Sequence, residues 1–252
     1  MFEARYLFYL LVGVLVLGVL QALTVGGLFF IRKSGEPRAN KFYGVLLVTF
    51  GLTLLHNVFN MTGFYEKNPS FYFLPIYFTL AFPVLLFYYV KLSLYPSYRL
   101  RWTDAKHLIL PLGQAIFFLV MFLSAVEFKS HFGRHFYNPF YGAFEQFLYL
   151  VTFFAYMYFA YRYVRQKRKH IKDQIEARRV LYLRYLIQVL FFLFAIHSIF
   201  VVWDFVSYEF LNINLRTVRP YAALGALSFA ALIFWLGIYG IQVLLWGKRV
   251  FK

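Results

Sequence analysis

The sequence predicts an all-α, polytopic integral membrane protein with seven transmembrane helices. Hydrophobic residues make up 62% of the 252 residues, against roughly 45–50% apolar residues in soluble domains. A bilayer core of about 30 Å needs roughly 20 apolar residues as helix, and the apolar stretches reach that length. They do not alternate in polarity, which disfavours a β-barrel. Because lipid offers the backbone no hydrogen bonds, each stretch is expected to be a helix.

Seven stretches meet this length and form a single domain, residues 1–252. In chain order the expected spans are Tyr6–Ile31, Phe42–Phe64, Phe71–Tyr95, His107–Phe128, Ala143–Val164, Val180–Leu211 and Pro220–Gly247. Pro83 lies inside the third span and predicts a kink there, because proline removes a helical hydrogen bond. The sixth span is too long for one straight crossing, so it extends past the bilayer or tilts.

Two of the segments between spans have distinctive compositions. The segment 129–142 after the fourth span is aromatic and is expected to be a long outer loop. The segment 165–179 after the fifth span is charged and is expected to be a helical extension. Two pairs in it, Lys169 with Asp173 and Lys172 with Glu176, have the i,i+4 spacing that supports an isolated helix.

The basic residues predict the orientation of the helices. With the N-terminus outside and the C-terminus in the cytoplasm, 20 of the 26 Lys and Arg residues lie on the cytoplasmic side. Cytoplasmic segments of membrane proteins carry such an excess. The expected location is therefore the bacterial inner membrane, with several passes. The net charge of +16 is expected to face anionic headgroups, because the chain offers no domain for nucleic acid.

One basic cluster lies directly after the fifth span. It consists of Arg165, Lys167, Arg168, Lys169 and Lys172. Positive charges near an anionic surface contribute about 1 kcal/mol each. We expect this cluster to contact membrane lipids or a protein partner at the membrane.

Polar residues within the apolar spans are the best indicators of a site, because they usually face the bundle or water. They are Gln21, His56, Asn57, Asn60, Gln114, Glu145, Gln146, Gln188, His197, Asp204 and Gln242. From these we select a candidate ligand site of His56, Asn60, Glu145, His197 and Asp204. Three of the five fall in the outer half, so an outward-facing pocket is expected. The alternative is that they only form hydrogen bonds between helices.

The sequence gives no support for a catalytic, metal or cofactor site. It has no cysteine, so thiolate ligands and cysteine nucleophiles are impossible. A histidine pair such as His56 and His197 can bridge a haem, but one pair is weak evidence. The last span has no lysine for a retinal Schiff base, and no catalytic or phosphate-binding motif is present. We therefore expect a protein that is not an enzyme and binds no cofactor.

An ordered motif runs from the third span into the fourth. It comprises Pro83–Tyr89 (PVLLFYY), Val90–Pro96 (VKLSLYP), Tyr98–Arg101 (YRLR), Asp104 and His107–Pro111 (HLILP). It resembles the corresponding segment of the seven-helix membrane sensor regions of Bacteroidetes AraC-type helix-turn-helix transcriptional regulators. The basic turn Arg38–Lys41 and the segment Gly237–Lys252 are similar as well.

This resemblance implies a sensor-like bundle. In that family a DNA-binding domain follows the seventh helix, whereas here no helix-turn-helix follows Gly247. DNA binding is therefore not expected, and a sensor of this kind would signal through a partner protein.

Three functions remain open from the sequence. The first is a receptor-like sensor and transducer acting through a partner. The second is a non-catalytic accessory subunit of a larger membrane complex. The third is a small transporter or an intramembrane enzyme.

Overall fold

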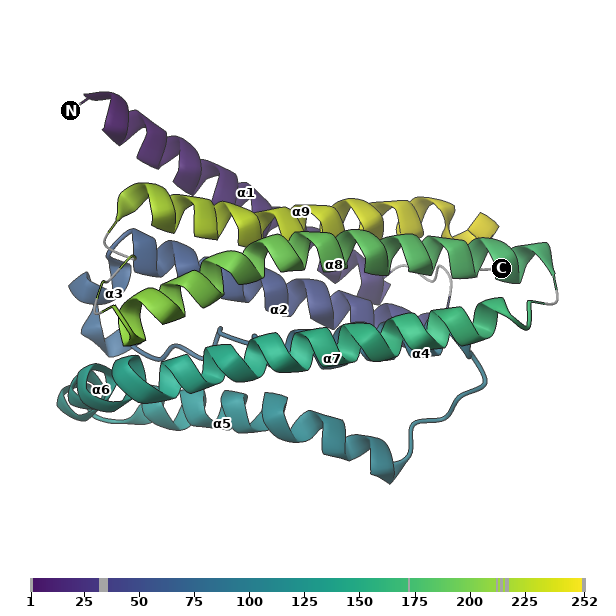
Figure 1. Ribbon diagram of the computed structural model, residues 1–252, viewed down its shortest axis with the longest axis horizontal. Coiled ribbons are helices and arrows are strands. Elements are labelled where there is room, and N and C mark those ends of the chain that lie inside the picture. Colours follow the sequence, from purple (N-terminus) through teal and green to yellow (C-terminus); the bar gives the residue numbers. More distant parts are fainter. Residues whose placement is uncertain are drawn as a thin grey trace.

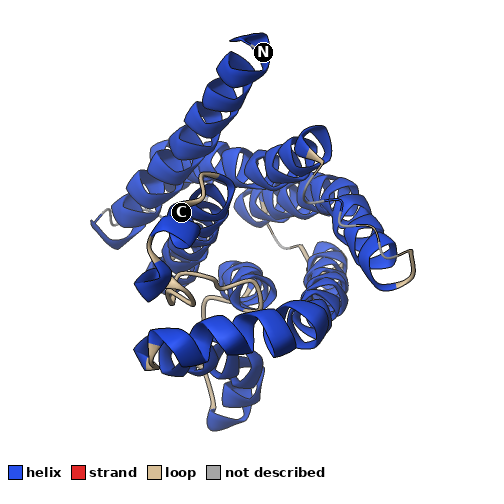
Figure 2. Cartoon of the chain, turned by 90° about the vertical axis from the view of Figure 1, so that its left-hand side faces the viewer, coloured by secondary structure: helices blue, strands red, loops and turns tan. Residues whose placement is uncertain are grey.

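Helices form nearly all of the structure, a computed structural model that describes residues 2–31, 36–171, 173–211, 213, 215 and 218–250 (Figure 1). In chain order the elements are α1 (Phe2–Ile31), α2 (Pro37–Met61), α3 (Phe64–Lys67), η1 (Pro69–Phe71), α4 (Ala81–Leu94), η2 (Trp102–Leu108), α5 (Ile109–Leu123), α6 (Val126–Phe132), η3 (Gly133–Tyr141), α7 (Gly142–Arg168), α8 (Gln174–Glu209) and α9 (Arg219–Val250). Among these residues there is no strand (Figure 2), so the all-α prediction is confirmed.

Five of the described helical segments are long and apolar enough to cross a membrane. They are Tyr6–Ile31, Pro37–Met61, Trp102–Leu123, Gln174–Tyr208 and Pro220–Leu245. The helix α4 is apolar but only 14 residues long. The helix α7 has 27 residues, but its tyrosines and basic last turn make it less apolar than the five. The structure is thus that of a helical membrane protein, and α1 begins and α9 ends at opposite ends of the bundle (Figure 1).

Glycines allow α1 and α2 to pack closely. A Cβ atom on Gly44 would lie 3.0 Å from the carbonyl oxygen of Gly26, and one on Gly26 would lie 3.0 Å from the carbonyl oxygen of Gly44. One on Gly51 would lie 3.0 Å from the Cβ atom of Ala22. Small residues at such positions let helix backbones approach each other in lipid, where dispersion contacts replace the hydrophobic effect as the driving force.

The expected third span is not one kinked helix. Only 81–94 forms the helix α4, and residues 72–80 are non-helical. Pro83 lies in the first turn of α4, where a backbone N–H has no helical partner to lose, so it starts the helix rather than bending it. Pro75 lies in the non-helical segment and interrupts the helix there instead. The kink prediction was therefore wrong.

The helix α4 lies inside the bundle, packed against α2, α7 and α8. Twelve of its 14 residues are buried. In contrast, α5 is peripheral and buries only Gln114, Phe118 and Met121. The first turns of α1 lean away from the other helices (Figures 1 and 2), and Tyr6, Leu7 and Leu10 are exposed there. These apolar surfaces suit contact with lipid.

The two segments between spans differ from expectation. The segment 129–142 is not a loop, because α6 continues into the π-helix η3 and then into α7. The charged segment 165–179 is not one helix, because α7 ends at Arg168 and α8 begins at Gln174. Asp173 accepts the backbone N–H of Glu176 at 2.6 Å and so caps the start of α8. The expected pairing of Asp173 with Lys169 is replaced by this cap.

Candidate functional site

The non-helical segment 72–80 lies beside α2, one of the helices that are long and apolar enough to cross a membrane. The backbone N–H of Phe78 donates to Thr53 Oγ1 at 3.0 Å. Thr53 precedes the end of α2 by eight residues, which corresponds to about 12 Å of helix. Non-helical backbone at such depth requires protein groups or water to satisfy it. Thr53 supplies one such group, and this segment is therefore the most unusual part of the fold.

A buried network of side chains satisfies one more backbone group of this segment. Gln114 accepts the backbone N–H of Leu80 at 3.0 Å and donates to Thr79 Oγ1 at 2.9 Å. Its Nε2 also donates to Glu145 Oε1 at 2.6 Å. The other carboxyl oxygen of Glu145 accepts the hydroxyl of Tyr137 at 2.8 Å. Glu145 is only 2% exposed, so this network joins α5, η3 and α7 to the non-helical segment.

Aromatic rings surround this network. Phe73 has a positive φ of 60°, which is strained for a residue with a bulky side chain. Its ring lies 5.1 Å from that of Tyr137 and 5.9 Å from that of Phe118, and the ring of Tyr77 lies 5.4 Å from Phe118. The packed rings hold the strained backbone in place.

Lys129 binds the start of the same region. It is 2% exposed, and its Nζ donates to the backbone oxygens of Ser70 and Phe122 at 2.5 and 3.1 Å. Burial lowers the pKa of its ammonium group below the usual 10.5. Lys129 thus links α6 to the start of the non-helical segment and to α5.

Two of the five candidate residues, His56 and Glu145, contact this segment or its network, and a third, His197, lies near Tyr149 of α7. Glu145 is in the network, and the ring of His56 lies 5.0 Å from that of Tyr77, while its Nδ1 hydrogen-bonds to the hydroxyl of Tyr65 at 2.8 Å. His197 is buried, with Nδ1 3.0 Å from Ser228 Oγ, and its ring lies 6.4 Å from that of Tyr149. Tyr149 is one turn after Glu145. None of the hydrogen bonds described for His56, Glu145 and His197 joins one of these residues to another.

The other two candidates lie elsewhere. Asn60 is exposed near the end of α2, and Asp204 is half-buried near the end of α8. The structure therefore gathers only part of the predicted set. Among the described residues, no group of three His, Asp or Glu side chains could hold a metal ion.

A second polar assembly lies at the opposite end of α4. Lys91 is mostly buried and its Nζ lies 3.7 Å from Asp104 Oδ1 and 3.7 Å from the ring centroid of Tyr98. The hydroxyl of Tyr98 donates to Asp104 at 2.8 Å, and the backbone N–H of Arg101 donates to the same carboxylate at 2.8 Å. These residues belong to the sequence motif that spans 83–111. The motif therefore forms one compact assembly of a buried cation, an aromatic ring and a carboxylate.

Neighbouring helices bind to this second assembly, or next to it, through arginines. Arg38 at the start of α2 donates to the backbone oxygens of Pro96 and Tyr98. Arg179 of α8 donates to the backbone oxygen of Ser93 at 3.4 Å. Arg38 thus holds the segment that follows α4, and Arg179 holds the last turn of α4 itself.

The basic cluster after the fifth span is only partly available to lipid or a partner. Arg165, Arg168 and Lys169 are exposed. Lys167 instead forms an ion pair with Glu176 at 2.9 Å and lies 5.7 Å from the ring of Tyr95. Lys172 lies outside the described residues.

Comparison with known proteins adds no assignment. No family model, curated protein or solved structure matches the chain. The resemblance to AraC-type sensor regions therefore stays a prediction from the motif, and the geometry alone carries the functional argument.

Sequence reasoning missed Thr53 and two members of the buried network. Gln114 was among the polar residues within spans, but Thr53, Thr79 and Tyr137 were not. The available signal was Pro75 together with Pro83, since two prolines eight residues apart within one apolar stretch indicate a broken helix.

Proposed function

We propose that this protein is a receptor-like membrane transducer that acts through a protein partner. In this proposal the chain crosses the bacterial inner membrane seven times, with its N-terminus outside and its C-terminus in the cytoplasm. Two observations support this topology: 20 of 26 basic residues fall on one side, and seven described helices have 14 or more residues.

The observation that carries the proposal is the position of α4 between two polar assemblies. Its outer end continues from the non-helical segment, where Leu80 donates to Gln114. Its inner end contains Lys91, which pairs with Asp104. With 14 residues it is about 21 Å long, and it is buried between α2, α7 and α8. A displacement at one end therefore reaches the other through a single rigid element.

The transduction step follows from this arrangement. A ligand that binds the outer network in place of the Gln114–Glu145 hydrogen bond frees the non-helical segment. The position of α4 then changes, and with it the distance between Lys91 and Asp104 at the cytoplasmic end. A ligand achieves this only to the extent that it binds one of the two arrangements more tightly. The partner would bind the surface around residues 95–108 and respond to its change.

The absence of cysteine in the sequence makes a direct test of this coupling practical. A single cysteine replaces Trp102, which is 95% exposed, and carries a spin label that reports the mobility of the inner segment. Glu145→Leu then breaks both hydrogen bonds of the carboxyl group. Phe144→Leu is the matched control, because the neighbouring Phe144 side chain is 57% exposed.

We expect Glu145→Leu to change the spectrum of the label at position 102 and Phe144→Leu to leave it unchanged. Identical spectra for both variants would contradict coupling through α4. Purification in mild detergent, followed by mass spectrometry of copurifying proteins, identifies the partner. It also distinguishes a transducer from an accessory subunit, which would copurify stoichiometrically with a large complex.

A second candidate is a small transporter, which the non-helical segment favours. Interrupted transmembrane helices with exposed backbone groups frequently form transport sites, and Glu145 is an ionisable group beside the interruption. Proteoliposomes containing a pH-sensitive dye test proton transport under an imposed gradient. Proton flux that disappears in Glu145→Gln would favour the transporter over the transducer.

A further inference from the structure

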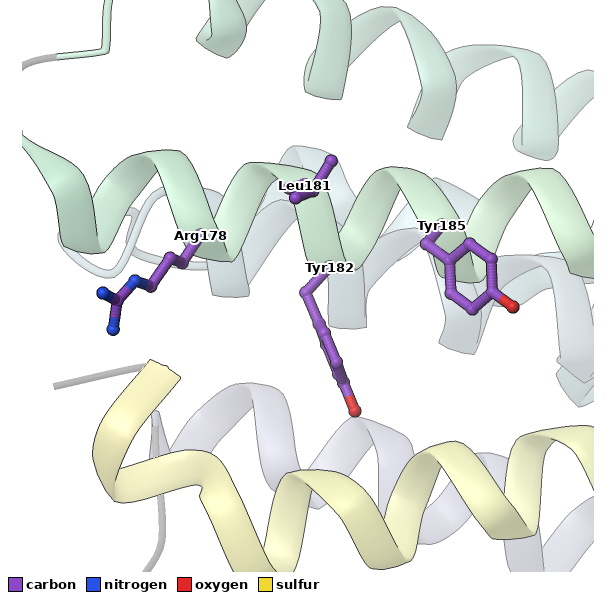
Figure 3. Close-up of a pocket in the computed structure, with 4 residues that line it drawn as sticks. All are labelled: Arg178, Leu181, Tyr182 and Tyr185. Carbon is purple, nitrogen blue, oxygen red and sulfur yellow. The ribbon is translucent and has the colours of Figure 1, made fainter.

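A groove lies along α8, at its cytoplasmic end in the proposed orientation, and the residues that line it all belong to α8. Its volume is about 440 Å³, and Arg178, Leu181, Tyr182 and Tyr185 line it (Figure 3). This size falls within the roughly 300–1,000 Å³ typical of small-molecule sites. The side chain of Tyr182 points from α8 toward α9 (Figure 3), where its hydroxyl donates to Gln242 Oε1. Tyr182 therefore forms the floor of the groove.

The lining residues change from charged to apolar along the helix. Arg178 lies just before the apolar stretch that begins at Val180, at the level expected for lipid headgroups. Leu181 and Tyr185 follow three and seven residues later, which places Tyr185 about 10 Å deeper along the helix axis. Both are more than half exposed. A lipid molecule has the same order along its length, with a polar head followed by an apolar chain.

Arg178 is exposed, and within the described residues it forms no ion pair or hydrogen bond with the protein. In this respect it differs from Arg38 and Arg179, which bind backbone oxygens. A guanidinium group without a protein partner at headgroup level is suited to a phosphate, with which it forms two parallel hydrogen bonds.

We propose that this groove binds one anionic phospholipid, with its phosphate on Arg178 and an acyl chain along Leu181, Tyr182 and Tyr185. A groove that faces lipid within the bilayer is filled by lipid chains, because water there would be costly. The anionic headgroup complements the basic end of the bundle, and anionic lipids give the cytoplasmic leaflet its negative potential. This site requires only that the protein is in a membrane, and it is independent of the proposed transduction.

The test measures lipid binding by the full chain in nanodiscs of phosphatidylcholine with phosphatidylglycerol, by native mass spectrometry. Arg178→Gln should reduce the preference for phosphatidylglycerol about fivefold, the effect of one basic group near an anionic surface. Leu181→Trp keeps the charge and fills the groove, and it should reduce the number of retained phosphatidylglycerol molecules by one. Arg162→Gln is the matched control, because Arg162 is an exposed helical arginine at the same end and does not line the groove.

Three results would overturn the proposal. The first is a wild-type protein without preference for phosphatidylglycerol over phosphatidylcholine. The second is an equal loss in Arg178→Gln and Arg162→Gln, which would mean a general effect of charge. The third is full lipid retention in Leu181→Trp, in particular if that variant instead changes the oligomeric state, since the groove would then bind a protein.

Discussion

Replacing Glu145 separates its structural role from its chemical role. Glu145→Leu removes both acceptors of the carboxyl group, so that the Nε2 of Gln114 and the hydroxyl of Tyr137 each lose a partner. Glu145→Gln removes the ionisable group but retains the shape. Its amide oxygen can still accept from Gln114, and its amide nitrogen can donate to the oxygen of Tyr137.

The structure sets the size of the expected effect. Hydrogen bonds between membrane helices contribute about 0.6 kcal/mol on average and at most about 1.7 kcal/mol. Two such bonds end at Glu145, so Glu145→Leu should lower the free energy of unfolding by about 1–3 kcal/mol. Glu145→Gln should change it by less than about 0.5 kcal/mol.

Unfolding in mixed detergent micelles by increasing fractions of dodecyl sulfate, followed by tryptophan fluorescence, measures these free energies. Gln146→Leu is the control, because it removes a neighbouring amide for which no hydrogen bond is described. A loss in Glu145→Gln as large as that in Glu145→Leu would refute the reasoning, because it would mean that the charge, and not the two hydrogen bonds, stabilises the network.

Three further predictions test other parts of the structure. Thr53→Val should destabilise the fold by about 1–3 kcal/mol, because it leaves the buried N–H of Phe78 without an acceptor; Thr49→Val, which loses only a bond within α2, should cost less in the same unfolding titration. Gly44→Ala should cost about 1–3 kcal/mol, because the added methyl group meets backbone at 3.0 Å, whereas Gly27→Ala, with no atom within 4 Å, should be neutral or stabilising. A fluorescent protein fused to the C-terminus should be active and a periplasmic phosphatase fused there inactive; the reverse would contradict the proposed orientation.

The helices were predictable because apolar length and backbone hydrogen bonding in lipid leave few alternatives. The same argument failed where proline determines the residue at which a helix begins. Pro83 was placed at a kink because the apolar stretch around it is continuous, yet helix formation before it depends on residues 72–80, which include Pro75. A loop was expected at 129–142 because this aromatic segment separates two apolar stretches, yet the end of α6 and the π-helix η3 fill it and continue into α7.

The burial of some candidate residues was predictable, but their partners were not. A polar residue in an apolar span must face the bundle, which identifies Glu145 and His197 as buried residues. Which atoms they meet depends on the rotation and axial position of three other helices, and no spacing in a single sequence encodes these. Asn60 shows the limit most clearly, since it shares a helix face with His56 but lies beyond the bundle contacts and is exposed.

The assembly at the other end of α4 is the opposite case, because local spacing is sufficient to predict its contacts. Lys91, Tyr98 and Asp104 lie within 14 positions of one another, and Pro96 ends the helix between them. A turn after α4 therefore returns the chain toward Lys91, and the carboxylate of Asp104 neutralises a cation that would be costly to bury alone. A motif of this kind is recognisable in sequence because all its members lie on one segment. The network around Gln114 and Glu145 has members on four segments, so no single stretch of sequence displays it, although both assemblies are attached to the same helix α4.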